Sequence, residues 1–127
     1  MLWLAQRLHL VPRRFGLPRL SARSLARGLR GAPAAEADAW LFTGCVMDAW
    51  QRDTHRSAIR VMQAAGARVA VSGGRVPCCG ALHEHAGRVD EARRLAERVV
   101  ASLPGDAPVV VDSAGCGAAM RDYGRLL

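Results

Sequence analysis

From residue 38 onward, short apolar runs alternate with longer stretches in which apolar and polar residues recur at helical spacing. Three apolar runs, at residues 39–42, 67–71 and 108–111, predict β-strands. The third run contains three consecutive valines and almost no polar residue, which is typical of a strand buried on both faces of a parallel sheet. We therefore expect three buried strands.

The stretches between and after these runs predict helices. Residues 48–65 form the first, and Gly66 is expected to end it. Residues 89–103 form the second, which is followed by the helix-terminating Pro104 and Gly105. A third helix is expected to start at Gly117 and to continue to residue 126.

Alternating strands and helices predict a parallel sheet with right-handed crossovers. The fold class is therefore α/β, and we expect a small three-layer Rossmann-like domain with a short parallel sheet. Three strands make a small sheet, and its edges normally need further strands or a partner surface to cover them. We therefore expect the chain to be a piece of a larger protein.

Residues 1–37 predict a basic leader or linker that precedes a domain at 38–127. The leader carries seven of the 18 arginines and almost no acid, and leucines at helical spacing predict a short amphipathic helix over 17–30. Two interpretations remain open, namely a linker or surface helix and an organellar transit peptide. No apolar run is long enough to predict a transmembrane helix.

The net charge of +7 comes from the leader, because the remaining residues balance their arginines with acids. Nucleic-acid-binding domains carry a basic face on the fold itself, with aromatic stacking groups among the basic residues. Only six of the 127 residues are Phe, Trp or Tyr, and they are not interleaved with arginines. The charge pattern therefore excludes nucleic acid as a partner.

The four cysteines are the candidate functional residues: Cys45, the adjacent pair Cys78 and Cys79, and Cys116. Each is expected in a loop that follows a strand. Parallel strands all end at one edge of a sheet, so the three loops should bring the four thiols together there. Thiolates are ligands for soft metals and iron–sulfur clusters. We therefore predict a metal or iron–sulfur site at the carboxyl edge.

Other interpretations of the cysteines stay open at this point. Four thiolates also suit a structural zinc ion, although adjacent cysteines cannot easily point at one small tetrahedral ion. Cys78 and Cys79 could instead form a strained redox-active disulfide. Free cysteines can also be simple core residues. The absence of a secretory signal argues for reduced thiols in a reducing compartment, which we take to be the cytoplasm.

Several residues beside the cysteines have candidate roles. Gly80 and Gly115, which flank the cysteines, would allow close backbone approach to a bulky group. His83 follows the cysteine pair and could tune a cluster through hydrogen bonds or relay protons; His85 is a weaker candidate. His55, with arginines on both sides, predicts a surface position.

Three further residues have expected structural roles. Asp48 is expected to cap the first long helix, and Tyr123 is expected to pack in the core. Asp112 follows the third strand. It could bond loop amides near Cys116 or be a simple turn acid.

Three sequence blocks resemble the cysteine-rich CCG domain: residues 41–45 (LFTGC), 78–83 (CCGALH) and 114–120 (AGCGAAM). That domain occurs in the iron–sulfur subunit of glycolate oxidase, in lactate-utilisation proteins and in one of the subunits of heterodisulfide reductase. The resemblance covers about residues 38–127 and is greatest to the first of two CCG repeats in the glycolate oxidase branch. The chain thus looks like a fragment of a two-repeat protein.

The resemblance implies that Cys45, Cys78, Cys79 and Cys116 hold an iron–sulfur cluster, which we expect to be of the 4Fe-4S type. It also implies electron transfer from a flavin-containing dehydrogenase subunit that oxidises glycolate or another 2-hydroxy acid. A ferredoxin-like domain and a second CCG repeat would be supplied elsewhere. The family pattern ends in CxxC, whereas Ala119 stands three residues after Cys116.

Two alternative functions accompany this expectation. One is a non-catalytic zinc- or thiol-containing docking module. The other is a thiol/disulfide redox subunit like that of heterodisulfide reductase. The expected location is the cytoplasm, and peripheral association with the inner face of the membrane stays open.

Overall fold

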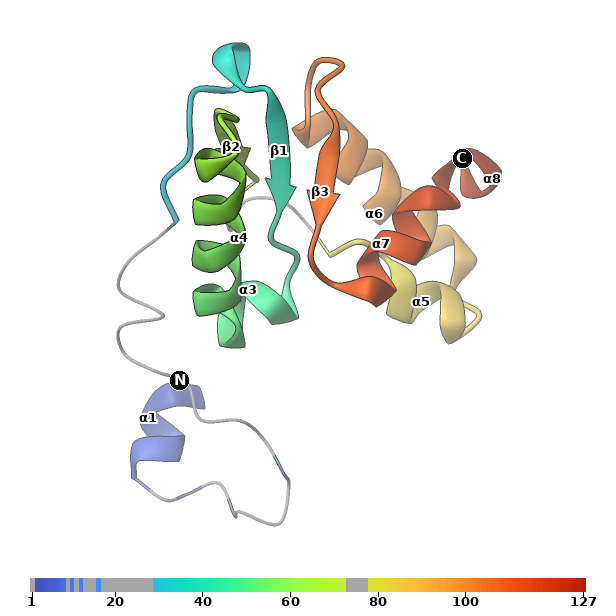
Figure 1. Ribbon diagram of the computed structural model, residues 1–127. Helices are drawn as coiled ribbons and strands as arrows, with labels where there is room; N and C mark the ends of the chain where they lie inside the picture. Colours follow the sequence, from blue (N-terminus) through green and yellow to red (C-terminus); the bar gives the residue numbers. More distant parts are fainter. Residues whose placement is uncertain (1, 9, 11, 13–15, 17–28, 73–77) are drawn as a thin grey trace.

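The computed structural model describes residues 2–8, 10, 12, 16, 29–72 and 78–127. Within this part of the chain, three strands form one parallel sheet, β1 (Ala39–Phe42), β2 (Val69–Val71) and β3 (Val109–Val111). Their spatial order is β2-β1-β3, so β1 is the central strand (Figure 1). All four residues of β1 are buried, because the sheet continues on both sides of this strand.

Helices follow each strand and make the crossovers of the sheet. The helical elements are α1 (Leu2–Arg7), the 3-10 turn η2 (Ala34–Glu36), α3 (Val46–Trp50), α4 (Arg52–Ala64), α5 (Ala81–His85), α6 (Val89–Ser102), α7 (Ala114–Arg121) and α8 (Tyr123–Leu126). In the part of the chain that the structure describes, no helix is both long and apolar enough to span a membrane. The longest is α6, with 14 residues.

Consecutive residues of β1 point to opposite faces of the sheet and define two cores. Leu41 packs with Ile59 of α4 and Val69 of β2. Phe42 packs on the other face, with Val99 of α6 and Tyr123 of α8. Helices therefore cover both faces, and the predicted three-layer α/β architecture is confirmed (Figure 1).

The predicted first helix is divided into two. Gln51 leaves the helical region (φ −120°, ψ 28°), although its N–H still donates to the carbonyl of Met47. The chain therefore makes the single turn α3 before it enters the longer α4. The expected end at Gly66 is confirmed, since this residue has φ +90°.

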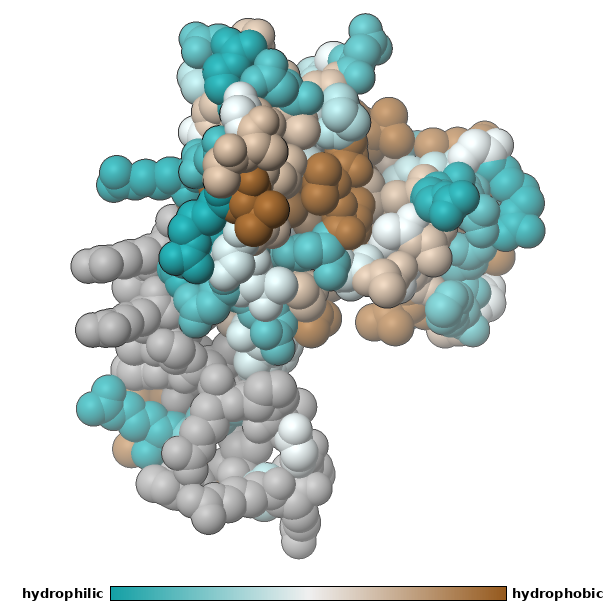
Figure 2. Space-filling model, viewed as in Figure 1, coloured by the Kyte–Doolittle hydropathy of each residue, from teal (hydrophilic) through white to brown (hydrophobic). Residues whose placement is uncertain are grey.

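The prediction that the third strand is buried on both faces is wrong. The exposed fractions of Val109 and Val110 are 38% and 37%. β3 pairs only with β1, so its outer edge has no neighbouring strand in the described residues. Figure 2 shows hydrophobic side chains gathered over β3 on the face that is viewed.

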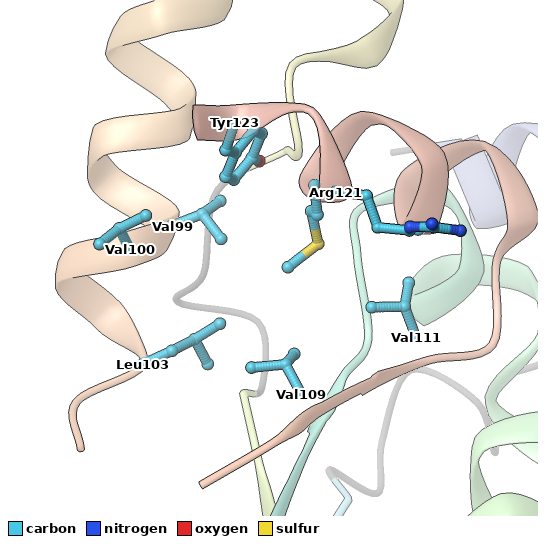
Figure 3. A pocket seen from close by; sticks show the side chains of 9 residues that line it. Val99, Val100, Leu103, Val109, Val111, Arg121 and Tyr123 are labelled. Carbon is cyan, nitrogen blue, oxygen red and sulfur yellow. The ribbon is translucent and has the colours of Figure 1, made fainter. Parts of the chain in front are cut away.

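An apolar cavity of about 480 Å³ lies beside this exposed strand. Figure 3 shows Val99 and Leu103 of α6 facing Val109 and Val111 of β3 across the cavity. Arg121 lies at the same cavity and is its charged lining residue. The edge of the sheet at β3 is therefore both unpaired and flanked by apolar surface.

The opposite edge of the sheet is partly covered by the segment that precedes the expected domain. The N–H of Ala32 donates to the carbonyl of Val69 at 2.7 Å, and Leu29 packs against the core between β2 and α4. The predicted boundary at residue 37 stays a prediction. Most of the amphipathic helix expected over 17–30 lies outside the described residues.

Candidate metal centre

All four cysteines line one cavity of about 190 Å³ at the carboxyl edge of the sheet. Cys45 precedes α3, and Cys78 and Cys79 precede α5. Cys116 lies in the first turn of α7, which begins at Ala114, so the expected helix start at Gly117 is three residues late. The fold thus brings together thiols from the connections after all three strands, as the edge argument predicts.

The four thiols are free, and they affect one another's ionisation mainly in two pairs. Cys78 perturbs the pKa of Cys45, and Cys116 perturbs the pKa of Cys79. The adjacent residues Cys78 and Cys79 thus belong to different pairs. Burial increases inward, from an exposed Cys45 to a Cys79 that is 4% exposed.

The pKa values of Cys79 and Cys116 are shifted in opposite directions. The neighbouring Cys79 thiol lowers the pKa of Cys116 to about 6, with a further lowering by Ser113 and against the effect of burial. The interaction with Cys116, together with burial, raises the pKa of Cys79. Burial of the Cys45 thiol raises its pKa, and the neighbouring Cys78 raises it further. Cys116 is therefore the thiolate of the pair near neutral pH.

This donor set fits an iron–sulfur cluster, because four thiols from three separate connections line one cavity. In the described residues, no three His, Cys, Asp or Glu side chains are grouped so that they could hold one metal ion. Two adjacent cysteines such as Cys78 and Cys79 cannot easily point at one small tetrahedral zinc ion. A cluster takes thiolates at several irons, which suits ligands that are spread around a cavity.

The glycines beside the cysteines have different structural roles. Gly80 has φ +87° and lies against Ala92 of α6, where an added Cβ would approach the Ala92 carbonyl oxygen to 3.0 Å. Gly44 has φ +63°, and an added Cβ would lie 3.7 Å from Cys116 Sγ. Gly115 lines the cavity but an added Cβ would meet no atom within 4 Å. Only the first two glycines are required by the backbone.

The two histidines of α5 lie beside the cavity rather than in its lining. His83 is partly buried, and its Nδ1 atom has no hydrogen-bond partner in the described residues. His85 is exposed. A role for His83 in tuning a bound cluster stays a prediction.

The expected surface position of His55 is wrong, because its side chain is fully buried. Nε2 lies 3.0 Å from the Thr43 carbonyl oxygen, and Nδ1 lies 2.6 Å from Asp112 Oδ2. The flanking arginines suggested exposure, but His55 precedes the buried Ile59 by one helical turn and shares its face. That spacing was the signal in the sequence.

Asp48 does not cap a helix, contrary to expectation. It lies inside α3, whose N-cap residue is Cys45, and its carboxylate accepts two hydrogen bonds from Arg52 at 2.9 and 2.8 Å. Arg52 is the first residue of α4, so this ion pair spans the break between the two helices. It therefore links α3, which follows Cys45, to the start of α4.

Tyr123 is buried, and it has a polar role in addition to the expected packing. Its hydroxyl donates to the Cys79 carbonyl at 2.7 Å. Burial, reinforced by the neighbouring cysteines, raises the pKa of the Tyr123 hydroxyl, so it remains a donor. The backbone of the most buried cysteine is thereby fixed to the last helix.

The fold and the site define a class of protein: a small α/β domain that gathers thiols from three crossover connections at one sheet edge. Residues 39–121 match the profile of the CCG family, described as a cysteine-rich domain. The chain belongs to this family. The resemblance of its three sequence blocks to CCG domains is thus confirmed.

The chain is also similar to several known proteins. It is 35% identical over 89 residues to a probable glycolate oxidase iron-sulfur subunit of Bacillus subtilis, covering 68% of this chain and 20% of that protein. It is 36% identical over 85 residues to a fumarate reductase (CoM/CoB) subunit of Methanothermobacter marburgensis, covering 66% and 17%.

Lactate utilization protein A of Bacillus velezensis is 28% identical over 86 residues, covering 68% of this chain and 36% of that protein. The matched segment therefore spans between about a sixth and about a third of these relatives. No solved structure matches the chain significantly.

Proposed function

We propose that this chain is an iron–sulfur electron-transfer module. The observation that carries the proposal is the single apolar cavity lined by four free thiols from three separate connections. The name of the Bacillus subtilis relative, an iron-sulfur subunit, supports the same cofactor. A bound cluster, which we propose to be of the 4Fe-4S type, would store and release single electrons.

The chain's own residues would hold the cluster and control its surroundings. Cys45, Cys78, Cys79 and Cys116 are the proposed ligands, and the low pKa of Cys116 supplies one thiolate without loss of a proton near neutral pH. Apolar neighbours such as Val46 and Leu82 line the rest of the cavity and are themselves exposed to solvent. Hydrogen bonds to sulfur and burial set the potential of such a centre.

The wider assembly is also a proposal. We place the module in the iron–sulfur subunit of a flavin-dependent dehydrogenase for glycolate or another 2-hydroxy acid, with substrate oxidised on the flavin partner. A second CCG repeat and a ferredoxin-like domain would complete the subunit, which works in the cytoplasm. Two features support a further domain: the unpaired edge of β3 with its apolar cavity, and relatives several times longer than the match. We propose that the second repeat covers that edge.

Anaerobic purification followed by iron, sulfide and zinc analysis tests the cofactor. We expect iron and sulfide in similar amounts, and an electron paramagnetic resonance signal that depends on reduction. Cys79→Ser should abolish the bound iron, while Gln63→Ala, on the exposed face of α4, should retain it. Zinc without iron would favour the docking-module alternative, and unchanged iron in Cys79→Ser would show that the ligand assignment is wrong.

A second candidate function is thiol/disulfide redox chemistry. Cys79 lowers the pKa of Cys116 to about 6, so that Cys116 is ionised near neutral pH beside a protonated thiol, as in a reactive thiol pair. The relative from Methanothermobacter marburgensis is named a fumarate reductase (CoM/CoB) subunit, and a subunit of a reductase is compatible with redox chemistry at these thiols. A metal-free chain that has four titratable thiols when reduced and two when oxidised, and that converts reversibly between these states, would favour this function over electron transfer by a cluster.

A further inference from the structure

Four polar residues without thiols connect the three segments that carry the cysteines. Thr43 follows β1 and lies two residues before Cys45, and Ser72 follows β2. Asp112 follows β3 and lies four residues before Cys116. His55 comes from α4 and stands between Thr43 and Asp112. Together they form a chain of hydrogen bonds across the carboxyl ends of the three strands.

The first part of this chain joins β1 to β2. The Thr43 N–H donates to Ser72 Oγ at 3.0 Å, and the two hydroxyl oxygens lie 3.3 Å apart. The Ser72 N–H in turn donates to the carbonyl of Leu41, which continues the pairing of the two strands by one residue. Thr43 is 1% exposed, and its bonds to the partly buried Ser72 are partly shielded from water.

The second part joins β1 to β3 through His55. The Thr43 carbonyl can only accept, so Nε2 must donate to it, and Nδ1 is left to share a proton with the Asp112 carboxyl at 2.6 Å. The imidazole thus uses both of its nitrogens on partners from two different strand ends. A fully buried ring that lost either partner would leave a polar atom unsatisfied, so the arrangement is strongly specified.

We propose that His55 is a positioning residue that, with Asp112, holds the Cys45 turn and the Cys116 turn at the spacing needed for a shared site. We call the three residues Thr43, His55 and Asp112 the edge clasp. The two turns already approach closely, since a Cβ on Gly44 would lie 3.7 Å from Cys116 Sγ. The effect on a bound cluster rests on the proposed function, whereas the effect on thiol spacing does not.

The test of thiol spacing uses the full chain without metal. In a Cys78→Ser, Cys79→Ser background, only Cys45 and Cys116 can react with a short bifunctional reagent that fluoresces once both ends have bound thiols. The informative pair of variants is Asp112→Ala and Asp112→Asn. Both remove the charge that raises the pKa of Cys116, but only Asn can keep a hydrogen bond to His55.

We expect Asp112→Ala to slow bridging about tenfold relative to Asp112→Asn, which corresponds to about 1.4 kcal/mol and lies near the worth of one hydrogen bond to a buried group. The control Gln63→Ala should stay within about twofold of the parent, because it leaves the clasp and the charges beside Cys116 unchanged. Equal bridging rates in Asp112→Ala and Asp112→Asn would overturn the proposal.

His55→Gln is the second variant, to be used where Asp112→Ala does not fold. Its amide nitrogen can replace Nε2 and keep the Thr43 bond, but it cannot also reach Asp112. We expect bridging as slow as in Asp112→Ala. Bridging at the parental rate in folded His55→Gln, with folding checked by circular dichroism, would refute the role of His55.

The consequence for the proposed cluster has its own measurement. In chains with all four cysteines, loaded with iron and sulfide under anaerobic conditions, Asp112→Ala should change the paramagnetic resonance signature and midpoint potential relative to Asp112→Asn. Identical signatures would show that the clasp does not act on the cluster. Failure of every chain to bind iron would overturn the proposed function, while the bridging result would still decide the clasp.

Discussion

Replacement of Gly80 by alanine should disturb the cysteine pair through the backbone alone. Gly80 directly follows Cys79 and is the N-cap residue of α5, with φ +87° and ψ −10°. An alanine Cβ would lie 3.0 Å from the carbonyl oxygen and 3.3 Å from the Cα of Ala92 in α6. Both atoms belong to the backbone of a long helix, so neither can move as a flexible side chain would.

The magnitude follows from comparison with Gly87, in the turn between the same two helices. Gly87 has φ +75°, but an added Cβ would meet no atom within 4 Å. Gly87→Ala should therefore lower the free energy of unfolding only because alanine disfavours the left-handed conformation. The net loss is about 1 kcal/mol, once the stabilising effect of a less flexible unfolded chain is included. Gly80→Ala adds the forced separation of α5 from α6, about 1–3 kcal/mol. The total is about 2–4 kcal/mol.

Thermal unfolding of both variants, followed by circular dichroism, measures this difference. A cost of about 1 kcal/mol shifts the midpoint by about 4–8 °C in a domain of this size, so Gly80→Ala should unfold roughly 10–25 °C below the parent. Gly87→Ala should lie within about 8 °C of the parent. Equal midpoints for the two variants would refute the argument that Gly80 is required by its contact with Ala92. A change in the alkylation rate of Cys79 in Gly80→Ala would show that the displaced backbone carries the thiol with it.

Three further substitutions test separate parts of the structure. Tyr123→Phe leaves the buried Cys79 carbonyl without its donor, so the free energy of unfolding should fall by about 1–3 kcal/mol in denaturant titration, and no change would contradict the bond. Asp38→Asn tests pH dependence. Hydrogen bonds from Arg68 lower the pKa of Asp38 to about 2, below its ordinary value. The stability that the Asp38 carboxylate contributes is therefore complete above about pH 4 and is lost as the pH falls toward 2. The thermal midpoint of Asp38→Asn should therefore fall less over that interval than the parent's, and parallel curves would contradict the assignment. Gly115→Ala should leave the metal-free chain as stable or stabilise it by about 0.5–1 kcal/mol, yet lower its iron content because the methyl group enters the cavity, and full iron content would show that the proposed cluster does not reach Gly115.

The sequence predicted the central part of the fold because its signals there are local. The first strand was expected at 39–42 and is found at those residues, since an apolar run buried on both faces needs no knowledge of its neighbours. The convergence of the cysteines followed from the rule that parallel strands end at one edge. That rule holds whatever the lengths of the connections, so it could join Cys45 to Cys116 across most of the domain.

Burial of the third strand could not be predicted in the same way. Its three valines read as a fully buried strand, yet Val109 and Val110 are more than a third exposed. Whether a strand is central or at an edge depends on the order of strands in space, which the local sequence does not encode. The valines instead give β3 an apolar surface, which the second repeat would cover in the assembly proposed above.

The same distinction explains why the edge clasp was missed. The sequence suggested Asp112 only as a partner of loop amides near Cys116 or as a turn acid, and it suggested a surface position for His55; the two residues are 57 positions apart. The two residues meet because β1 pairs with β3 and because α4 packs against the sheet. The residue at the end of the central strand therefore contacts both neighbours. Thr43 donates its N–H to Ser72 and accepts a hydrogen bond from His55 at its carbonyl. Because both bonds use the Thr43 backbone, a substitution of its side chain should leave them intact, and the spacing of the thiols depends on the partners instead.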